Sequence, residues 1–115
     1  MLRYGRPVAV LIVEIEPASP RQLDRIAQLI GTIVRREARE TDRIARMGPG
    51  RFQVLLPETH EREAMALGER IQRACAEVAA TTATGGAAVR TAAAGPVAGQ
   101  TLVDALRAAE ARLAA

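Results

Sequence analysis

The fold is decided by residues 39–52, which read Arg-Glu-Thr-Asp-Arg-Ile-Ala-Arg-Met-Gly-Pro-Gly-Arg-Phe. Near its end this stretch contains Gly-Pro-Gly-Arg, residues 48–51, which is typical of a tight turn between two short strands. The segment that follows ends in the apolar run Val-Leu-Leu-Pro, residues 54–57. A β-hairpin is therefore predicted, with strands at Arg43–Met47 and Phe52–Leu56.

Outside the hairpin, the spacing of apolar residues predicts the other elements. Val8–Ile15 is apolar and rich in β-branched residues, which indicates a buried strand. Apolar residues at helical spacing before and after the hairpin predict helices. The remaining expected elements are helices at Arg21–Ala38, Glu58–Ala79 and Leu102–Leu113 and a fourth strand at Thr81–Val89.

The resulting order, β-α-β-β-α-β-α, is that of a ferredoxin-like sandwich. This is an α+β fold in which helices pack on an antiparallel sheet. We expect the strands Val8–Ile15 and Arg43–Met47 in the interior of the sheet, and the helices Arg21–Ala38 and Glu61–Ala79 on one face. Ser19 is predicted to cap the first of these helices, with Pro20 at its first position, and Thr59 to cap the second.

Composition limits the class of protein. The length of 115 residues fits a single domain, residues 1–115, with one core. No apolar run approaches the ~20 residues of a membrane-spanning helix, so no membrane insertion is expected. The one cysteine, Cys75, excludes an internal disulfide and fits a reducing cytosol, so a cytoplasmic location is expected. Its place in a helical pattern predicts a buried side chain.

The basic residues are unusual, because all 16 are arginine and the chain has neither lysine nor asparagine. Planar guanidinium groups suit phosphates and guanine edges. The net charge of +3 is nevertheless small and evenly spread, and one Tyr and one Phe offer little stacking surface. These features argue against binding to DNA or RNA.

The hairpin resembles the signature hairpin of the GGDEF family, the diguanylate cyclases. The resemblance extends over nearly the whole chain, because several other segments match the family's pattern. They are Met1–Glu16 for the first strand, Glu69-Arg70-Ile71 for a helix segment, Thr84–Ala88 for a later strand and Leu106–Leu113 for the terminal helix. The resemblance implies the nucleotide-cyclase version of the sandwich, in which the family has a last strand after the final helix that is missing here.

The resemblance also implies that cyclase activity is lost. The family's enzymes join two GTP molecules with the help of metal ions held by carboxylates. Glu14 and Glu16 take the places of the acids at the end of the first strand, but Gly50 and Arg51 stand where the hairpin should supply further acids. Pro49 replaces a turn glycine, and a chain without Asn or Lys cannot provide the family's guanine-reading segment. No catalytic residue, metal site or cofactor is expected, and the two glutamates are interpreted as a solvated strand end.

A ligand-binding motif is retained just before the hairpin. Arg39 and Asp42 form an Arg-x-x-Asp sequence at the spacing at which the family carries its product-inhibition site for cyclic di-GMP, and Arg70 stands where that site has a second arginine. Arginine can donate to the O6 and N7 acceptors of guanine, while a carboxylate accepts from N1 and N2. The resemblance therefore implies a regulatory domain that binds cyclic di-GMP at Arg39, Asp42 and Arg70.

Other interpretations of the same residues remain open. Arg21–Asp24 is a second Arg-x-x-Asp sequence without this context, Asp42 could cap a turn, and Arg70 could be a solvated helix residue. The alternative function is a module that binds no nucleotide and acts through dimerisation or contacts with another protein. A third is GTP binding without turnover. A homodimer or protein partner is expected, and His60 is interpreted as a surface residue at a helix start.

Overall fold

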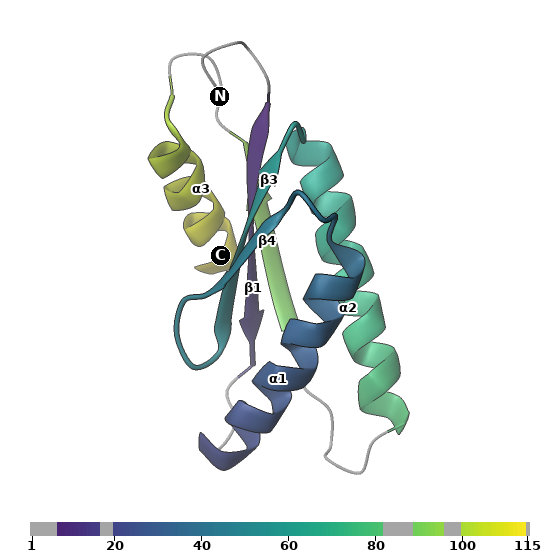
Figure 1. Cartoon of the computed structure of the whole chain (residues 1–115). Coiled ribbons are helices and arrows are strands. Elements are labelled where there is room, and N and C mark those ends of the chain that lie inside the picture. Colours follow the sequence, from purple (N-terminus) through teal and green to yellow (C-terminus); the bar gives the residue numbers. More distant parts are fainter. Residues whose placement is uncertain (1–6, 17–19, 82–88, 96–99, 115) are drawn as a thin grey trace.

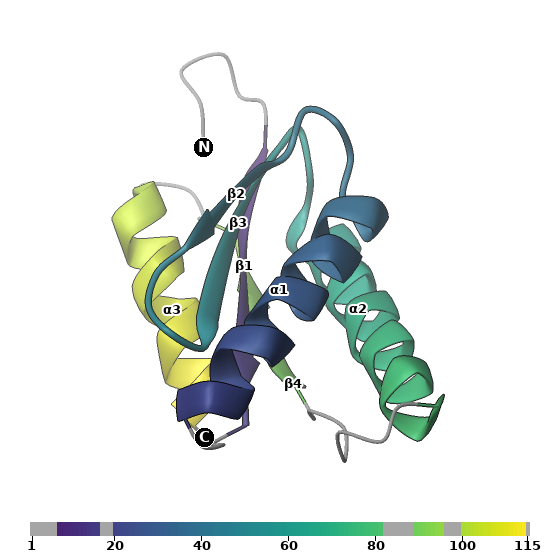
Figure 2. The same cartoon turned by 60° about the horizontal axis from the view of Figure 1, so that its bottom comes forward.

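The computed structural model describes residues 7–16, 20–81, 89–95 and 100–114, and its elements follow the predicted order (Figure 1). A four-stranded antiparallel sheet carries helices on both faces. Helices α1 and α2 lie on one face and α3 on the other (Figure 2). The α+β class is confirmed. The elements are β1 Val8–Ile15, α1 Pro20–Glu37, β2 Arg43–Arg46, β3 Arg51–Pro57, α2 Glu61–Thr81, β4 Val89–Ala94 and α3 Leu102–Ala114.

The strand order is β2-β3-β1-β4. Strand β1 is interior, as predicted, because its side chains are buried on both faces of the sheet. Leu11 and Val13 belong to the core under α1 and α2, whereas Val10 and Ile12 belong to the core under α3. This alternation follows from the two-residue repeat of a strand, and it explains why residues 8–13 are continuously apolar.

The prediction that β2 lies in the interior was wrong, because β2 is an edge strand and β3 takes the interior place. Of the four residues of β2, only Ile44 is half-buried, and the other three are exposed. Short, charged strands are suited to a sheet edge, since an arginine-lined edge disfavours pairing with another chain. Strand β3 instead alternates between buried and half-buried positions, and Phe52, Val54 and Leu56 enter the core.

The fourth strand was also misplaced. Helix α2 continues through Thr81, and β4 begins only at Val89, the last residue of the predicted strand. Residues 82–88, including the segment Thr84–Ala88, lie outside the described residues. The misplacement has a physical reason. The strand ends in alanines, which have low intrinsic β-propensity and so give no strand signal. These small side chains, Ala92–Ala94, are buried between the sheet's helices.

The first residues of α1 and α2 can be compared with the predicted helix starts and caps. Pro20 is the first residue of α1, as predicted, whereas its proposed cap, Ser19, lies outside the described residues. Helix α2 begins at Glu61 rather than Glu58, because Glu58 has a positive φ of 53° and so interrupts the helical path. Thr59 does not cap α2. Its hydroxyl instead donates to the Pro57 carbonyl and accepts from Arg39.

Close approach of α2 to the sheet depends on Gly68. A Cβ atom built on this residue would lie 2.9 Å from Thr91 Oγ1 and 3.1 Å from Leu11 Cδ1. Arg112 of α3 links the two layers of helices, because its Nη1 donates hydrogen bonds to Glu61 of α2 and to the Ala93 carbonyl of β4, both at 2.6 Å. The Arg112 guanidinium lowers the pKa of Glu61.

No described helix is long and apolar enough to cross a membrane.

Candidate functional site

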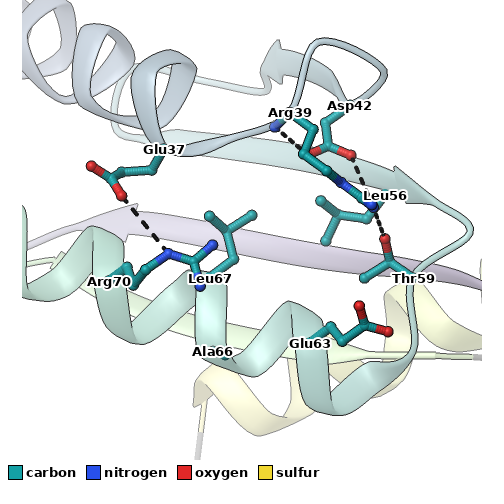
Figure 3. Close-up of a pocket in the computed structure, with 9 residues that line it drawn as sticks. All are labelled: Glu37, Arg39, Asp42, Leu56, Thr59, Glu63, Ala66, Leu67 and Arg70. Atoms are coloured by element: carbon teal, nitrogen blue, oxygen red, sulfur yellow. Dashed lines mark hydrogen bonds and ion pairs between the residues drawn. The ribbon is translucent and has the colours of Figure 1, made fainter.

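A pocket of about 240 Å³ opens where the end of α1 and the turn after it meet the end of β3 and the first turns of α2 (Figure 3). All three predicted ligand-binding residues line it, although they come from separate segments of the chain. Arg39 and Asp42 lie on the turn after α1, and Arg70 lies on α2. The other lining residues are Glu37, Leu56, Thr59, Glu63, Ala66 and Leu67.

The turn between α1 and β2 is closed by Arg39 and Asp42 themselves. The backbone N–H of Arg39 donates to Asp42 Oδ2 at 2.7 Å, and the backbone N–H of Asp42 donates to the Arg39 carbonyl at 3.0 Å. Short polar side chains commonly close turns in this way. The capping role considered for Asp42 is therefore present, and it fixes the carboxylate at the wall of the pocket.

The second carboxylate oxygen of Asp42 is left without a donor. Asp42 is only 3% exposed, and no group in the described part of the chain donates a hydrogen bond to Oδ1. The nearest cation, Arg39 Nη2, is 3.9 Å away. A buried acceptor without a partner costs free energy, about 1–3 kcal/mol or more for a charged group. This oxygen is therefore an unused hydrogen-bond acceptor in a residue that lines the pocket.

The Arg39 side chain is anchored across the pocket mouth. Its Nη2 group donates to the Pro57 carbonyl at 3.1 Å and to the Thr59 hydroxyl. The same hydroxyl donates to the Pro57 carbonyl at 2.9 Å. Thr59 therefore orients Arg39, a role that the sequence did not predict because threonine near a helix start is typical of a cap.

Arg70 faces Arg39 across the pocket and has a different partner. Arg70 Nε lies 3.8 Å from Glu37 Oε1, at the last residue of α1. The Arg70 side chain is 51% exposed and that of Glu37 25% exposed. Sequence reasoning found neither Glu37 nor Glu63, because their approach to the pocket depends on how α1 packs on α2.

The hairpin side of the molecule holds a separate cluster of charged side chains around Arg51. Arg51 Nη2 donates to Glu14 Oε2 at 2.6 Å, and Arg51 Nη1 lies 3.5 Å from Glu110 of α3. Glu14, interpreted as a solvated strand end, is half-buried and paired with Arg51, whereas Glu16 is exposed as expected. Among the described residues, no group of three or more His, Cys, Asp or Glu side chains could hold a metal ion.

The hairpin turn is held in place by hydrogen bonds and an ion pair of Arg46. Arg46 donates to the carbonyls of Gly48 and Pro49 and pairs with Asp24 at 3.2 Å. Asp24, from the second Arg-x-x-Asp sequence, is thus a partner of the turn and lies outside the pocket lining. A Cβ atom on Gly50 would meet Leu23 Cδ1 at 3.3 Å, so the turn packs closely on α1.

Two remaining residues match their expected places. His60 is exposed, one residue before α2, and its backbone N–H donates to Glu63 Oε1 at 3.2 Å. Cys75 is buried in α2, and burial raises the pKa of its thiol to about 11. A thiol with so high a pKa is protonated at neutral pH and is a poor nucleophile.

Comparison with solved structures shows the same fold in cyclase domains. The active GGEEF domain of a diguanylate cyclase from Vibrio cholerae matches with a TM-score of 0.85 and 16% identity, over 96% of this chain and 76% of that one. Diguanylate cyclase SiaD from Pseudomonas aeruginosa, solved with its activator SiaC, matches with a TM-score of 0.78 and 21% identity, over 96% and 46%.

A third solved structure is the GGDEF domain of DgcB from Caulobacter crescentus in complex with c-di-GMP. It has a TM-score of 0.74 and 16% identity, over 96% of this chain and 71% of that one. A comparison with curated proteins gives no match. The family model described as "Diguanylate cyclase, GGDEF domain" matches residues 18–115. Because that match covers most of the chain, we conclude that this protein belongs to the GGDEF domain family.

Proposed function

We propose that this GGDEF domain is a regulatory module without cyclase activity that binds cyclic di-GMP in the pocket formed by Arg39, Asp42 and Arg70. The observation that carries the proposal is the unpartnered, buried Asp42 Oδ1, which lies 3.9 Å from the Arg39 guanidinium in a pocket that Arg70 also lines. A carboxylate and an arginine are the side-chain types that pair with opposite edges of a guanine.

The chemistry of the pocket supports guanine as the bound base. Asp42 is an acceptor, so it favours a ligand edge that carries adjacent N–H donors, as the N1 and N2 positions of guanine do. Arg39 can donate to O6 and N7 or stack on the base, and Arg70 can meet a phosphate. A volume of about 240 Å³ is below the usual range for a whole drug-sized ligand, so one base would enter while the rest of the ligand stays outside.

Two further observations support this ligand and the absence of catalysis. The DgcB domain, which has the same fold, was solved with c-di-GMP bound. In the present chain the Arg51 guanidinium occupies the Glu14 carboxylate, which a metal ion would need. The chain also has no asparagine or lysine for the guanine-reading segment expected of a cyclase.

The decisive experiment is calorimetric titration of the purified domain with cyclic di-GMP, with GTP and cyclic di-AMP as controls. We expect binding of cyclic di-GMP with a Kd in the micromolar range or below. Little or no binding is expected for cyclic di-AMP, because adenine lacks the N1–H donor that Asp42 requires. Absence of heat and of any thermal shift at high micromolar cyclic di-GMP would reject the proposal.

A second candidate is a module that binds no nucleotide and acts through a homodimer or another protein. The observation in its favour is that Arg39 and Arg70 already have partners within the chain. SiaD, which has the same fold, was solved with a protein activator. Sedimentation of the domain with and without cyclic di-GMP separates the two proposals. A dimer that forms independently of ligand, together with silent calorimetry, favours the second.

A further inference from the structure

The two arginines of the pocket differ in what holds them. Arg39 donates hydrogen bonds to two neutral acceptors, the Pro57 carbonyl and the Thr59 hydroxyl, and its Nη2 also lies 3.9 Å from Asp42 Oδ1. Arg70 is bound by a carboxylate, because its Nε lies 3.8 Å from Glu37 Oε1 (Figure 3). A ligand phosphate that approaches Arg70 therefore meets a site that already contains a negative charge.

We infer that Glu37 is an affinity-determining residue of this pocket, which competes with the ligand's phosphate for the Arg70 guanidinium. The inference rests on the proposed function, because it concerns the same pocket and an anionic ligand. Binding then exchanges one anion for another at Arg70. The affinity therefore depends on how much more favourably Arg70 interacts with the phosphate than with Glu37.

Glu37 is singled out among the three acidic residues of the pocket. Asp42 is committed to the backbone of the Arg39 turn, and Glu63 accepts from the His60 backbone N–H at the start of α2. Neither has an ion pair with Arg70 among the described residues. Glu37 alone of the three reaches Arg70.

If a phosphate displaces Glu37 from Arg70, the Glu37 carboxylate still has a second cationic partner. Its other oxygen, Oε2, lies 3.4 Å from Nε of Arg36, a residue of α1 that does not line the pocket. When a phosphate occupies Arg70, the Glu37 carboxylate keeps this second pair. The exchange therefore does not strand a partly buried charge, which would otherwise oppose binding.

The charge balance also selects the class of phosphate. The lining contains three carboxylates, from Glu37, Asp42 and Glu63, and two guanidinium groups, from Arg39 and Arg70. A phosphodiester adds one negative charge to this balance, whereas a triphosphate adds about four and is repelled more strongly by Glu37. Glu37 therefore favours a guanine phosphodiester over GTP.

The test compares Glu37→Gln with the wild type. Glutamine keeps the shape of the side chain and removes the competing charge. Glu69→Gln is the matched control, because Glu69 is the chain neighbour of Arg70 but is exposed and does not line the pocket. Calorimetry with cyclic di-GMP and with GTP is run on all three proteins, and on Arg70→Ala with and without Glu37→Gln.

We expect Glu37→Gln to bind cyclic di-GMP about two- to five-fold more tightly, the range expected for a half-exposed ion pair. The gain for GTP should be larger, and Glu69→Gln should match the wild type. In the Arg70→Ala background, Glu37→Gln should give no more than a small gain, because the contested cation is gone.

The ion pair has its own readout without ligand. The Nε–H resonance of Arg70, identified by its loss in Arg70→Lys, should shift in Glu37→Gln and stay in place in Glu69→Gln. If wild type binds cyclic di-GMP but Glu37→Gln binds equally or more weakly, the inference on Glu37 is overturned and the proposed function stands. If no variant binds cyclic di-GMP, both fail, and an unmoved Arg70 resonance removes the inference by itself.

Discussion

Arg51 Nη2 lies 2.6 Å from Glu14 Oε2, so a hairpin arginine holds the carboxylate at the end of β1. The same guanidinium reaches Glu110 of α3 at 3.5 Å. These two ion pairs of Arg51 join β1, β3 and α3 at one end of the sheet.

The first prediction concerns catalysis. The protein incubated with GTP and Mg²⁺ or Mn²⁺ should produce no cyclic di-GMP above background, because the Arg51 guanidinium occupies the Glu14 carboxylate. The double change Gly50→Asp with Arg51→Glu should not restore turnover, since the chain still has no asparagine or lysine for guanine recognition. Product formation is measured by chromatography. Turnover by the homogeneous wild-type protein would contradict the interpretation of the hairpin.

The second prediction concerns the core under α3. Ile12 is 1% exposed between β3 and β4, and Ile12→Asp should prevent stable folding. An unpaired carboxylate there costs several kcal/mol against a total stability of about 5–15 kcal/mol. Val103→Asp is the control, because Val103 is 56% exposed in the first turn of α3. Circular dichroism during urea titration should show a change within about 0.5 kcal/mol for the control.

The third prediction concerns the packing of α2 on the sheet. Gly68→Ala should lower the free energy of unfolding although alanine favours helices, because its Cβ would lie 2.9 Å from Thr91 Oγ1. The loss should be about 1–3 kcal/mol. The double variant Gly68→Ala with Thr91→Ala should recover part of it, since the clashing hydroxyl is removed. A Gly68→Ala variant as stable as the wild type in urea would argue against the close approach of α2.

The fourth prediction concerns Cys75. Burial raises the pKa of its thiol to about 11, so the thiol is neutral in the folded protein at pH 7. We expect Cys75 to react with a thiol reagent such as Ellman's reagent only when the chain is unfolded by urea. Because the folded pKa lies above the unfolded one, the contribution of this thiol to stability is complete below about pH 8.5 and is lost as the pH rises towards 11. Rapid labelling of the native protein at pH 7 would contradict the burial.

The sequence predicted those features that local patterns determine. Strand β1 was predicted from the apolar run Val8–Ile15, and the hairpin from its glycine turn. The start of α1 was predicted from Pro20. The position of β2 at the sheet edge was missed, because an edge and an interior strand differ in their partners and not in their own periodicity. Strand β4 was misplaced because its alanines have little β-propensity, and only packing against the helices makes them a strand.

In the candidate site, too, the sequence predicted what local patterns determine and missed what depends on packing. Arg39 and Asp42 are three residues apart, so their turn could be anticipated, and Arg70 was placed by the resemblance of its helix segment. Glu37 and Thr59 could not be anticipated, because each acts on an arginine that is distant in the sequence. Their partners are set by how α1 packs on α2 and by the positive φ of the residue before Thr59.

The last prediction separates ligand binding from folding at one atom, Asp42 Oδ1. In Asp42→Asn the side-chain carbonyl can still accept from the Arg39 backbone N–H, while the amide group replaces the unpartnered oxygen. The folded state loses a buried charge whose Oδ1 accepts no hydrogen bond and whose recorded cation, Arg39 Nη2, is 3.9 Å away, so the melting temperature should stay the same or rise.

Affinity for cyclic di-GMP should move in the opposite direction. The new amide would oppose the N1–H and N2–H donors of guanine, so Asp42→Asn should weaken binding by about 1–3 kcal/mol. Arg39→Ala should weaken it by a similar amount, and Arg70→Ala by less, because Arg70 meets only a phosphate. Arg73→Ala is the control, since Arg73 is exposed on α2 and does not line the pocket. Calorimetry and thermal melts on the same samples decide the point. If Asp42→Asn keeps wild-type affinity, guanine is not read by this carboxylate, and if it fails to fold, Asp42 acts only as the closing residue of its turn.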